Sequence, residues 1–186
     1  ETRSAIFKVR VCGMVFSPWS KILEKLVILS VGRLVPKKGY LMQLAIYRAL
    51  ADAGVAFRAI IVGGGPLRSE LEHERDRLEL GNNVDFIGSL PRREVALLQT
   101  KADLFFFTGV ADESGDRDGL PNVLPEAMAA GAIVLTSPTG GAAEAVADGK
   151  SGYLLSPTEP EAWVHRVVKL CEEPDRTRRI RRAARH

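Results

Sequence analysis

From residue 26 to its end, the chain alternates short apolar or β-branched runs with longer amphipathic stretches. This rhythm is typical of a parallel sheet whose strands are joined by helices. The predicted strands are residues 26–31, 56–62, 84–87, 103–107, 132–135 and 152–155. Helices are predicted over residues 40–53, 66–80, 91–100, 121–130, 142–147 and 160–172, and from Pro174 onward. The expected fold is therefore α/β: a doubly wound, mostly parallel, six-stranded Rossmann-like sheet with helices on both faces.

The two ends of the chain suggest a longer protein. Residues 26–186 are expected to form the Rossmann-like domain, whereas residues 1–25 combine one strand-like run with an irregular stretch that contains proline and tryptophan. We interpret residues 1–25 as a connector from a missing N-terminal domain. The C-terminal sequence stops inside an arginine-rich helical pattern without a stop signal, so both ends are expected to be cuts.

The composition, with 46% apolar and 26% charged residues, is that of a soluble globular protein. No apolar run approaches the ~20 residues of a membrane-spanning helix, and the N-terminus lacks a signal-peptide pattern. A cytoplasmic setting is expected, and peripheral contact with the inner membrane face stays open. The two cysteines, Cys12 and Cys171, lie far apart and belong to no Cys/His cluster, so no metal is expected. No cofactor is expected either.

Ligands of an open parallel sheet bind outside the carboxyl ends of its strands. In this sequence, three of the predicted strands are followed by residues that could bind a ligand. The first predicted strand is followed by Gly-Arg-Leu-Val-Pro-Lys-Lys-Gly, residues 32–39, directly before a helix. Arg33, Lys37 and Lys38 thereby come close to the free N–H groups of a helix N-terminus, which favours an anion. The turn is a candidate diphosphate site that needs no metal. A solvated basic turn is the alternative.

Three glycines follow the second predicted strand, at residues 63–65, directly before Pro66. Such a turn lets a ligand approach the backbone closely, which makes Gly64 a candidate contact. Taken alone, this motif is at least as well explained by a purely structural turn.

The third strand end is the segment 116–126, Asp-Arg-Asp-Gly-Leu-Pro-Asn-Val-Leu-Pro-Glu. Asp118 lies in a loop, and Glu126 lies about one turn inside the next helix, where its side chain is expected to point back toward the ligand-binding edge. Two carboxylates so placed can have different roles, because the first can accept hydrogen bonds from sugar hydroxyls and the second from a ribose diol. The alternative is an acidic surface loop beside an ordinary helical glutamate.

Four motifs occur in order: Val31-Gly-Arg-Leu-Val-Pro-Lys-Lys-Gly39, Ile61-Val-Gly-Gly-Gly-Pro66, Val84-Asp-Phe-Ile-Gly88 and Asp118-Gly-Leu-Pro-Asn-Val-Leu-Pro-Glu-Ala-Met-Ala129. Together they resemble the C-terminal domain of glycosyltransferase family 4, which has the GT-B fold and is marked by an E-x7-E motif. The resemblance covers residues 9–186. The sequence of residues 116–121 is similar to that of bacterial exopolysaccharide enzymes of the colanic-acid type.

The resemblance implies a role for each candidate residue. Arg33 and Lys38 would bind the donor diphosphate and stabilise it as a leaving group, and Glu126 would hold the nucleotide ribose. Asp118 would hold the hydroxyls of the donor sugar and, with Lys38 and Arg33, is a candidate catalytic residue. Backbone contacts to the donor would come from Gly64, Leu90, Gly119, Leu120 and Pro121, with Leu90 next to the base. Asp118 departs from the family pattern, because it replaces the first glutamate of the motif and shortens it by one methylene.

The resemblance also implies the reaction, which is transfer of a sugar from a nucleoside-diphosphate sugar to an acceptor hydroxyl with retention and without metal. In the family, the acceptor site and usually a catalytic histidine belong to the N-terminal domain, so the chain alone is expected to be inactive. His73, His165 and His186 are expected to be solvated or packed rather than catalytic. Glu144 is interpreted equally well as a helix-start residue or as a donor contact.

The arginines of the C-terminal segment 176–185 have several interpretations. A solvated or interdomain surface comes first, a membrane surface second and nucleic acid a distant third, because no aromatic side chain is interleaved with them. No nucleic-acid partner is therefore expected. Two alternatives to the transferase stay open: a non-catalytic nucleotide-binding module, and a GT-B-type sugar epimerase or phosphorylase.

Overall fold

The computed structural model describes residues 10–11, 14–15, 25–110 and 121–185. It contains six strands of one sheet: β3 (Leu26–Val31), β4 (Phe57–Val62), β5 (Val84–Gly88), β6 (Leu104–Phe107), β7 (Ile133–Thr136) and β8 (Gly152–Leu154). Their order is β5-β4-β3-β6-β7-β8, and every neighbouring pair is parallel. The predicted fold class is confirmed, and this sheet is wholly parallel. A separate antiparallel pair, β1 (Arg10–Val11) and β2 (Met14–Val15), precedes it.

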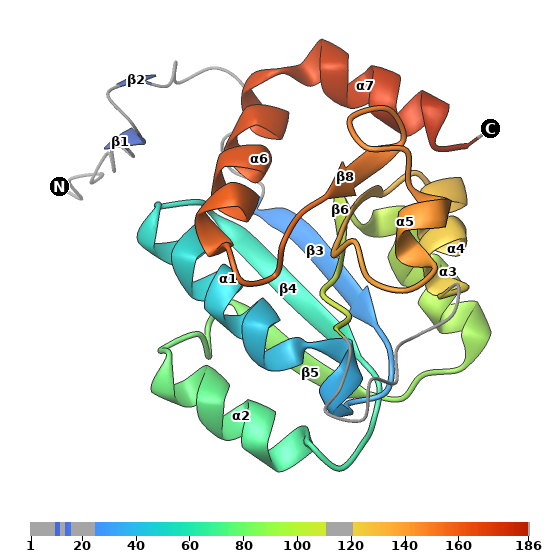
Figure 1. Cartoon of the computed structure of the whole chain (residues 1–186). Helices are drawn as coiled ribbons and strands as arrows, with labels where there is room; N and C mark the ends of the chain where they lie inside the picture. The colour runs from blue at the N-terminus through green and yellow to red at the C-terminus, as the bar shows by residue number, and fades with distance from the viewer. Residues whose placement is uncertain (1–9, 12–13, 16–24, 111–120, 186) are drawn as a thin grey trace, which may run out of the picture.

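Helices cover both faces of the sheet (Figure 1). One face carries α1 (Tyr40–Asp52), α2 (Arg68–Arg77) and α6 (Pro160–Glu172), and the other carries α3 (Arg92–Lys101), α4 (Val123–Ala130) and α5 (Ala142–Ala145). A short 3-10 turn, η1 (Pro36–Lys38), precedes α1, and α7 (Pro174–Ala183) follows α6. Within the described ranges, no helix is long and apolar enough to cross a membrane.

Alternating side chains explain why the sheet is covered twice. Along β6, Leu104 and Phe106 belong to the hydrophobic cluster under α1 and α6, whereas Phe105 and Phe107 belong to the cluster under α4 and α5. Successive side chains of a strand point to opposite faces, so an uninterrupted apolar strand needs a helical layer on each side. The continuous apolar runs of the sequence therefore dictate a three-layer fold.

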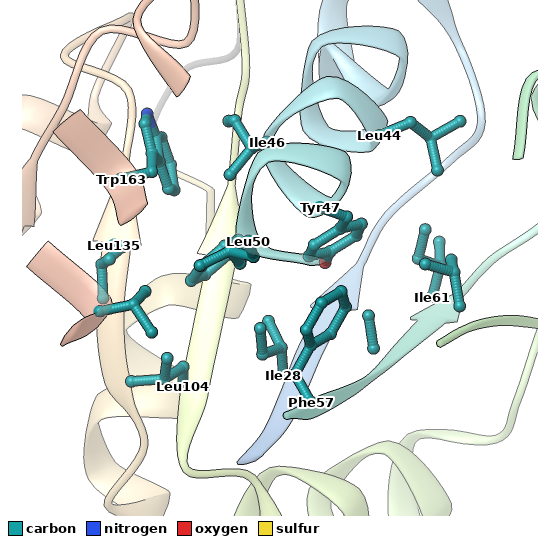
Figure 2. Close-up of a cluster of buried hydrophobic side chains, with 14 of the residues drawn as sticks. Ile28, Leu44, Ile46, Tyr47, Leu50, Phe57, Ile61, Leu104, Leu135 and Trp163 are labelled. Atoms are coloured by element: carbon teal, nitrogen blue, oxygen red, sulfur yellow. The ribbon is translucent and has the colours of Figure 1, made fainter. Parts of the chain in front are cut away.

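The larger cluster contains aromatic side chains, among them Tyr47, Phe57 and Trp163 (Figure 2). Tyr47 of α1 stacks on Phe57 and on Phe106, with ring centroids 5.6 and 5.8 Å away. Trp163 of α6 meets Phe106 edge-on at 4.9 Å, and its indole N–H donates to the Ser156 carbonyl oxygen at 2.9 Å. These contacts join α1 and α6 across the strands.

The helix α7 is held at the edge of the sheet where the strands begin. Arg181 donates to the Asp103 carboxylate at 3.2 Å, and the other oxygen of that carboxylate accepts the Val27 N–H at 3.1 Å. Asp103 was expected inside the strand, but it lies just before β6 and connects β3, β6 and α7. The arginine-rich helix thus lies at the edge opposite to the carboxyl ends of the strands.

Most of the other element boundaries lie within one or two residues of the expected ones. The helix predicted from Pro66 begins at Arg68 and ends at Arg77, because residues 66–67 form a turn after the glycines. The helix predicted from Pro121 begins at Val123, and its end at Gly131, in the left-handed region with φ 98°, agrees with the prediction.

Candidate functional site

The strand order reverses between β3 and β6, because β4 and β5 lie on one side of β3 while β7 and β8 lie beyond β6. In open parallel sheets, ligands bind at such a point, in the crevice outside the carboxyl ends of the two central strands. The loop after β3 contains residues 32–39, and the loop after β6 begins at Thr108. The Val110 N–H donates to the Lys37 carbonyl oxygen at 2.9 Å, which ties the two loops together.

A buried polar network lies under this crevice. The Gln43 amide donates to the Ser30 hydroxyl and to the Tyr47 hydroxyl, both at 2.5 Å, and its carbonyl oxygen accepts from the Thr108 hydroxyl at 3.1 Å. Ser30 donates in turn to the Phe106 carbonyl oxygen at 3.0 Å. Burial raises the pKa of Tyr47 to about 12, although its hydrogen bonds with Ser30 and Gln43 offset part of that effect. The network joins β3, α1 and the end of β6, and so holds the carboxyl ends of the two central strands in place.

The two candidate diphosphate ligands belong to the loop after β3. Lys38 is half-buried, and its ammonium group lies 4.9 Å from the ring centroid of Phe107 at the end of β6. Arg33 is exposed, and its guanidinium makes no hydrogen bond or ion pair within the part of the chain that the structure describes. The structure therefore places the Lys38 ammonium group against the end of β6 and leaves Arg33 exposed in the same loop.

The glycine turn after β4 packs against the same loop. A Cβ on Gly63 would lie 1.9 Å from the Gly32 carbonyl oxygen, and one on Gly65 would lie 2.4 Å from the Leu34 carbonyl oxygen. These two glycines are thus required by backbone contact. Gly64 is exposed, and its carbonyl oxygen accepts the Leu34 N–H at 3.0 Å. The structural interpretation of the turn holds for Gly63 and Gly65, and Gly64 remains accessible at the edge of the sheet.

Two further candidates, Leu90 and Glu126, lie next to the helices α3 and α4. Leu90 is half-buried, because its side chain packs against the cluster on that face of the sheet. Glu126 lies in the first turn of α4, and its carboxylate accepts from Arg92, the first residue of α3, at 3.0 Å. No sequence motif pointed to Arg92. The helices α3 and α4 both begin at the carboxyl ends of strands, so Leu90, Arg92 and Glu126 belong to the same edge as Lys38.

Three of the predicted donor contacts, Asp118, Gly119 and Leu120, lie outside the described residues, as does His186. Pro121 is described and buried, and its carbonyl oxygen accepts the Leu124 N–H at 2.9 Å at the start of α4. The roles expected for these positions stay predictions.

The remaining titratable candidates lie apart from the crevice or on its rim. His73 and His165 are exposed on α2 and α6. Glu144 is exposed in the first turn of α5, which also begins at the carboxyl edge. Across residues 25–110 and 121–185, no three His, Cys, Asp or Glu side chains group in a way that would hold a metal ion.

Comparison with known proteins agrees with this architecture. The family model described as glycosyl transferases group 1 matches residues 16–186. The chain belongs to the group 1 glycosyltransferases. The resemblance inferred from the four motifs is therefore confirmed.

Three relatives of this glycosyltransferase chain show how much of a protein it represents. It is 34% identical over 143 residues to the putative colanic acid biosynthesis glycosyltransferase WcaL of Salmonella typhimurium, covering 77% of this chain and 35% of that protein. It is 32% identical over 168 residues to the GDP-mannose-dependent alpha-(1-6)-phosphatidylinositol monomannoside mannosyltransferase of Mycolicibacterium smegmatis, covering 88% and 43%. The crystal structure of Anabaena HepE in complex with UDP-glucose superposes with a TM-score of 0.75 at 27% identity, covering 87% and 43%. The chain thus spans between about a third and somewhat under half of the length of these proteins.

Proposed function

We propose that this chain is the donor-binding domain of a retaining glycosyltransferase and binds a nucleoside-diphosphate sugar in the crevice between β3 and β6. In the full-length protein, the sugar moves to an acceptor hydroxyl that an N-terminal domain holds. The product is a polysaccharide or a glycolipid, as the names of WcaL and of the mannosyltransferase suggest for those proteins.

The convergence of three segments on one sheet edge carries this proposal. The cationic loop with Lys38, the glycine turn with the accessible Gly64, and the start of α4 with Glu126 all follow carboxyl ends of parallel strands. An elongated ligand with a diphosphate in its middle matches this order of cation, backbone and carboxylate. The HepE complex with UDP-glucose supports the same ligand class.

The chemistry assigned to the residues follows from charge. Lys38 and Arg33 stabilise the negative charge that develops on the departing diphosphate, so the reaction proceeds without a metal. Glu126 accepts hydrogen bonds from the ribose diol. Asp118 accepts from the donor sugar, and the backbone of residues 119–121 lies beside it in the sequence. The N-terminal domain binds the acceptor and provides the groups that act on the acceptor hydroxyl. The chain alone therefore binds the donor without turnover.

Calorimetry with UDP, GDP and ADP on the 186-residue chain tests the binding half of this proposal. One nucleotide is expected to bind, and Lys38→Ala is expected to weaken it by about tenfold or more, because a charge-assisted hydrogen bond is lost. Lys150→Ala is the matched control, since Lys150 is exposed in the turn before β8, at the edge where that strand begins. If none of the three nucleotides binds the wild type, the site assignment is wrong.

Turnover by the full-length protein tests the catalytic half. Asp118→Ala and Lys38→Ala are each expected to abolish transfer, and the anomeric configuration of the product is expected to match that of the donor by NMR. A product of inverted configuration would refute retention. Nucleotide binding without any turnover by the full-length protein would favour a nucleotide-binding module.

A further inference from the structure

An ion pair connects the helices α3 and α4 at the donor edge. The Arg92 guanidinium Nη2 lies 3.0 Å from Glu126 Oε1. The Arg92 side chain is 90% exposed and the Glu126 side chain 35% exposed. Arg92 begins α3, two residues after Leu90, and Glu126 lies in the first turn of α4. The pair is thus formed by two helix starts that both follow carboxyl ends of strands of the sheet.

The ion pair between Arg92 and Glu126 is expected to contribute little to the stability of the fold. Ion pairs as exposed as this one contribute little to folding, because water and salt screen them and two long side chains lose freedom. Arg93, the next residue, is equally charged and exposed, and it makes no ion pair or hydrogen bond with the described part of the chain. Of these two neighbouring arginines, Arg92 is therefore the one that pairs with a carboxylate in the described part of the chain. Its partner, Glu126, is the carboxylate assigned to the ribose.

The geometry of the contact leaves the carboxylate able to bind a ligand. The contact involves one nitrogen of Arg92 and one oxygen of Glu126, so among the described residues Oε2 and a lone pair of Oε1 stay available. A ribose diol donates from two adjacent hydroxyls, and a carboxylate whose rotation is already restricted accepts both with less ordering on binding.

We propose that Arg92 is a positioning residue that fixes the Glu126 carboxylate for the ribose diol and thereby sets the preference for ribonucleotides. This inference rests on the proposed donor site. It adds that recognition of the 2′-hydroxyl depends on a cation that lies on a different helix from the carboxylate.

Calorimetry with ribo- and 2′-deoxyribonucleotides separates positioning from a general effect of charge. The probes are the diphosphate among UDP, GDP and ADP that the wild type binds most tightly, and its 2′-deoxy form. The wild type is expected to prefer the ribonucleotide by about tenfold or more, since a hydrogen bond to a charged group is lost in the deoxy form. Arg92→Ala is expected to reduce this preference to about threefold or less.

Arg93→Ala is the matched control, because it removes the same charge one residue away from the ion pair. It is expected to leave the ratio of the two affinities unchanged, even where long-range attraction for the diphosphate falls slightly. Equal ratios in the wild type and in Arg92→Ala, an equal change in Arg93→Ala, or tighter ribonucleotide binding by Arg92→Ala would each refute the inference.

Failure of the inference is distinguishable from failure of the proposed function. If the wild type binds no nucleotide, the donor site itself is wrong. If the wild type binds and discriminates against the deoxy form, but the Arg92→Ala ratio is unchanged, only the positioning role is wrong. Urea unfolding of Arg92→Ala, expected to match the wild type, shows that any change in the ratio comes from the site.

Discussion

Thr108 lies against Gly39 with both its side chain and its backbone. The Thr108 hydroxyl lies 3.1 Å from the Gly39 carbonyl oxygen, and the Thr108 carbonyl oxygen would lie 2.1 Å from a Cβ on Gly39. Gly39 also has φ 66°, in the left-handed region that side chains rarely adopt. The loop that contains Lys38 is therefore fixed against the end of β6 by a contact that only glycine permits.

Replacement of Gly39 by alanine is expected to destabilise the protein by at least about 3 kcal/mol, because backbone strain and overlap with a backbone oxygen add together. Gly149→Ala provides the control. Gly149 has a similar φ, 69°, but open space where a Cβ would lie, so strain alone is expected to reduce stability by about 1 kcal/mol. Urea unfolding measures both, and equal losses would show that the Thr108 contact has no role.

Thr108→Val removes the hydroxyl and keeps the shape of the side chain. It leaves the buried carbonyl oxygen of Gln43 without its donor, so a loss of about 1–3 kcal/mol is expected in urea unfolding. Thr100→Val is the comparison, because the Thr100 hydroxyl is exposed and only contacts a carbonyl oxygen of its own helix. That variant is expected to change stability by less than about 0.5 kcal/mol, and a similar loss in both would argue against the network.

Tyr47 makes stability depend on alkaline pH. Its pKa is raised from 10.0 to about 12 in the folded protein, mainly by burial. Between these values the unfolded chain loses the proton while the folded chain keeps it, so unfolding becomes more favourable as the pH rises. The loss reaches about 3 kcal/mol across this window and is absent below it. Urea midpoints from about pH 9 to 12 are expected to fall more steeply for the wild type than for Tyr47→Phe, and parallel curves would contradict this.

Asp103 is expected to matter more than its exposure suggests. Asp103→Ala removes the acceptor of the Val27 N–H and the partner of Arg181 together, so a loss of about 1–2 kcal/mol is expected. Asp175→Ala breaks the exposed pair with Arg178 on the same helix and is expected to change stability by less than about 0.5 kcal/mol. Thermal unfolding of the two variants checks this difference. No difference would mean that α7 is not held through Asp103.

The layered sheet was predictable from the sequence, because its signal is local. Continuous apolar runs such as β6, and glycines such as Gly131 that end helices, act within a few residues and mark where elements begin and end. The turn at residues 66–67 was missed because proline suits both a turn and a first helical turn, and only packing decides between them.

Contacts between distant polar residues were not predictable in the same way. Gln43 and Thr108 sit among apolar neighbours, and their spacing does not reveal that they meet under the crevice. Gln43 on the buried stripe of α1, three residues after Tyr40, was the one signal that a polar side chain needed a buried partner. The pairing of Arg92 with Glu126 had no signal, because it depends on how α3 and α4 pack.

Gly39 and Thr108 are 69 residues apart in the chain, yet they meet at the crevice floor. A chain that has folded only its first half therefore has no complete crevice, and donor occupancy becomes a property of the whole fold. Nucleotide at ten times its dissociation constant would add about 1.4 kcal/mol to global stability. Hydrogen exchange in β4 and in β7, on opposite sides of the crevice, would then slow by a common factor when the ligand binds.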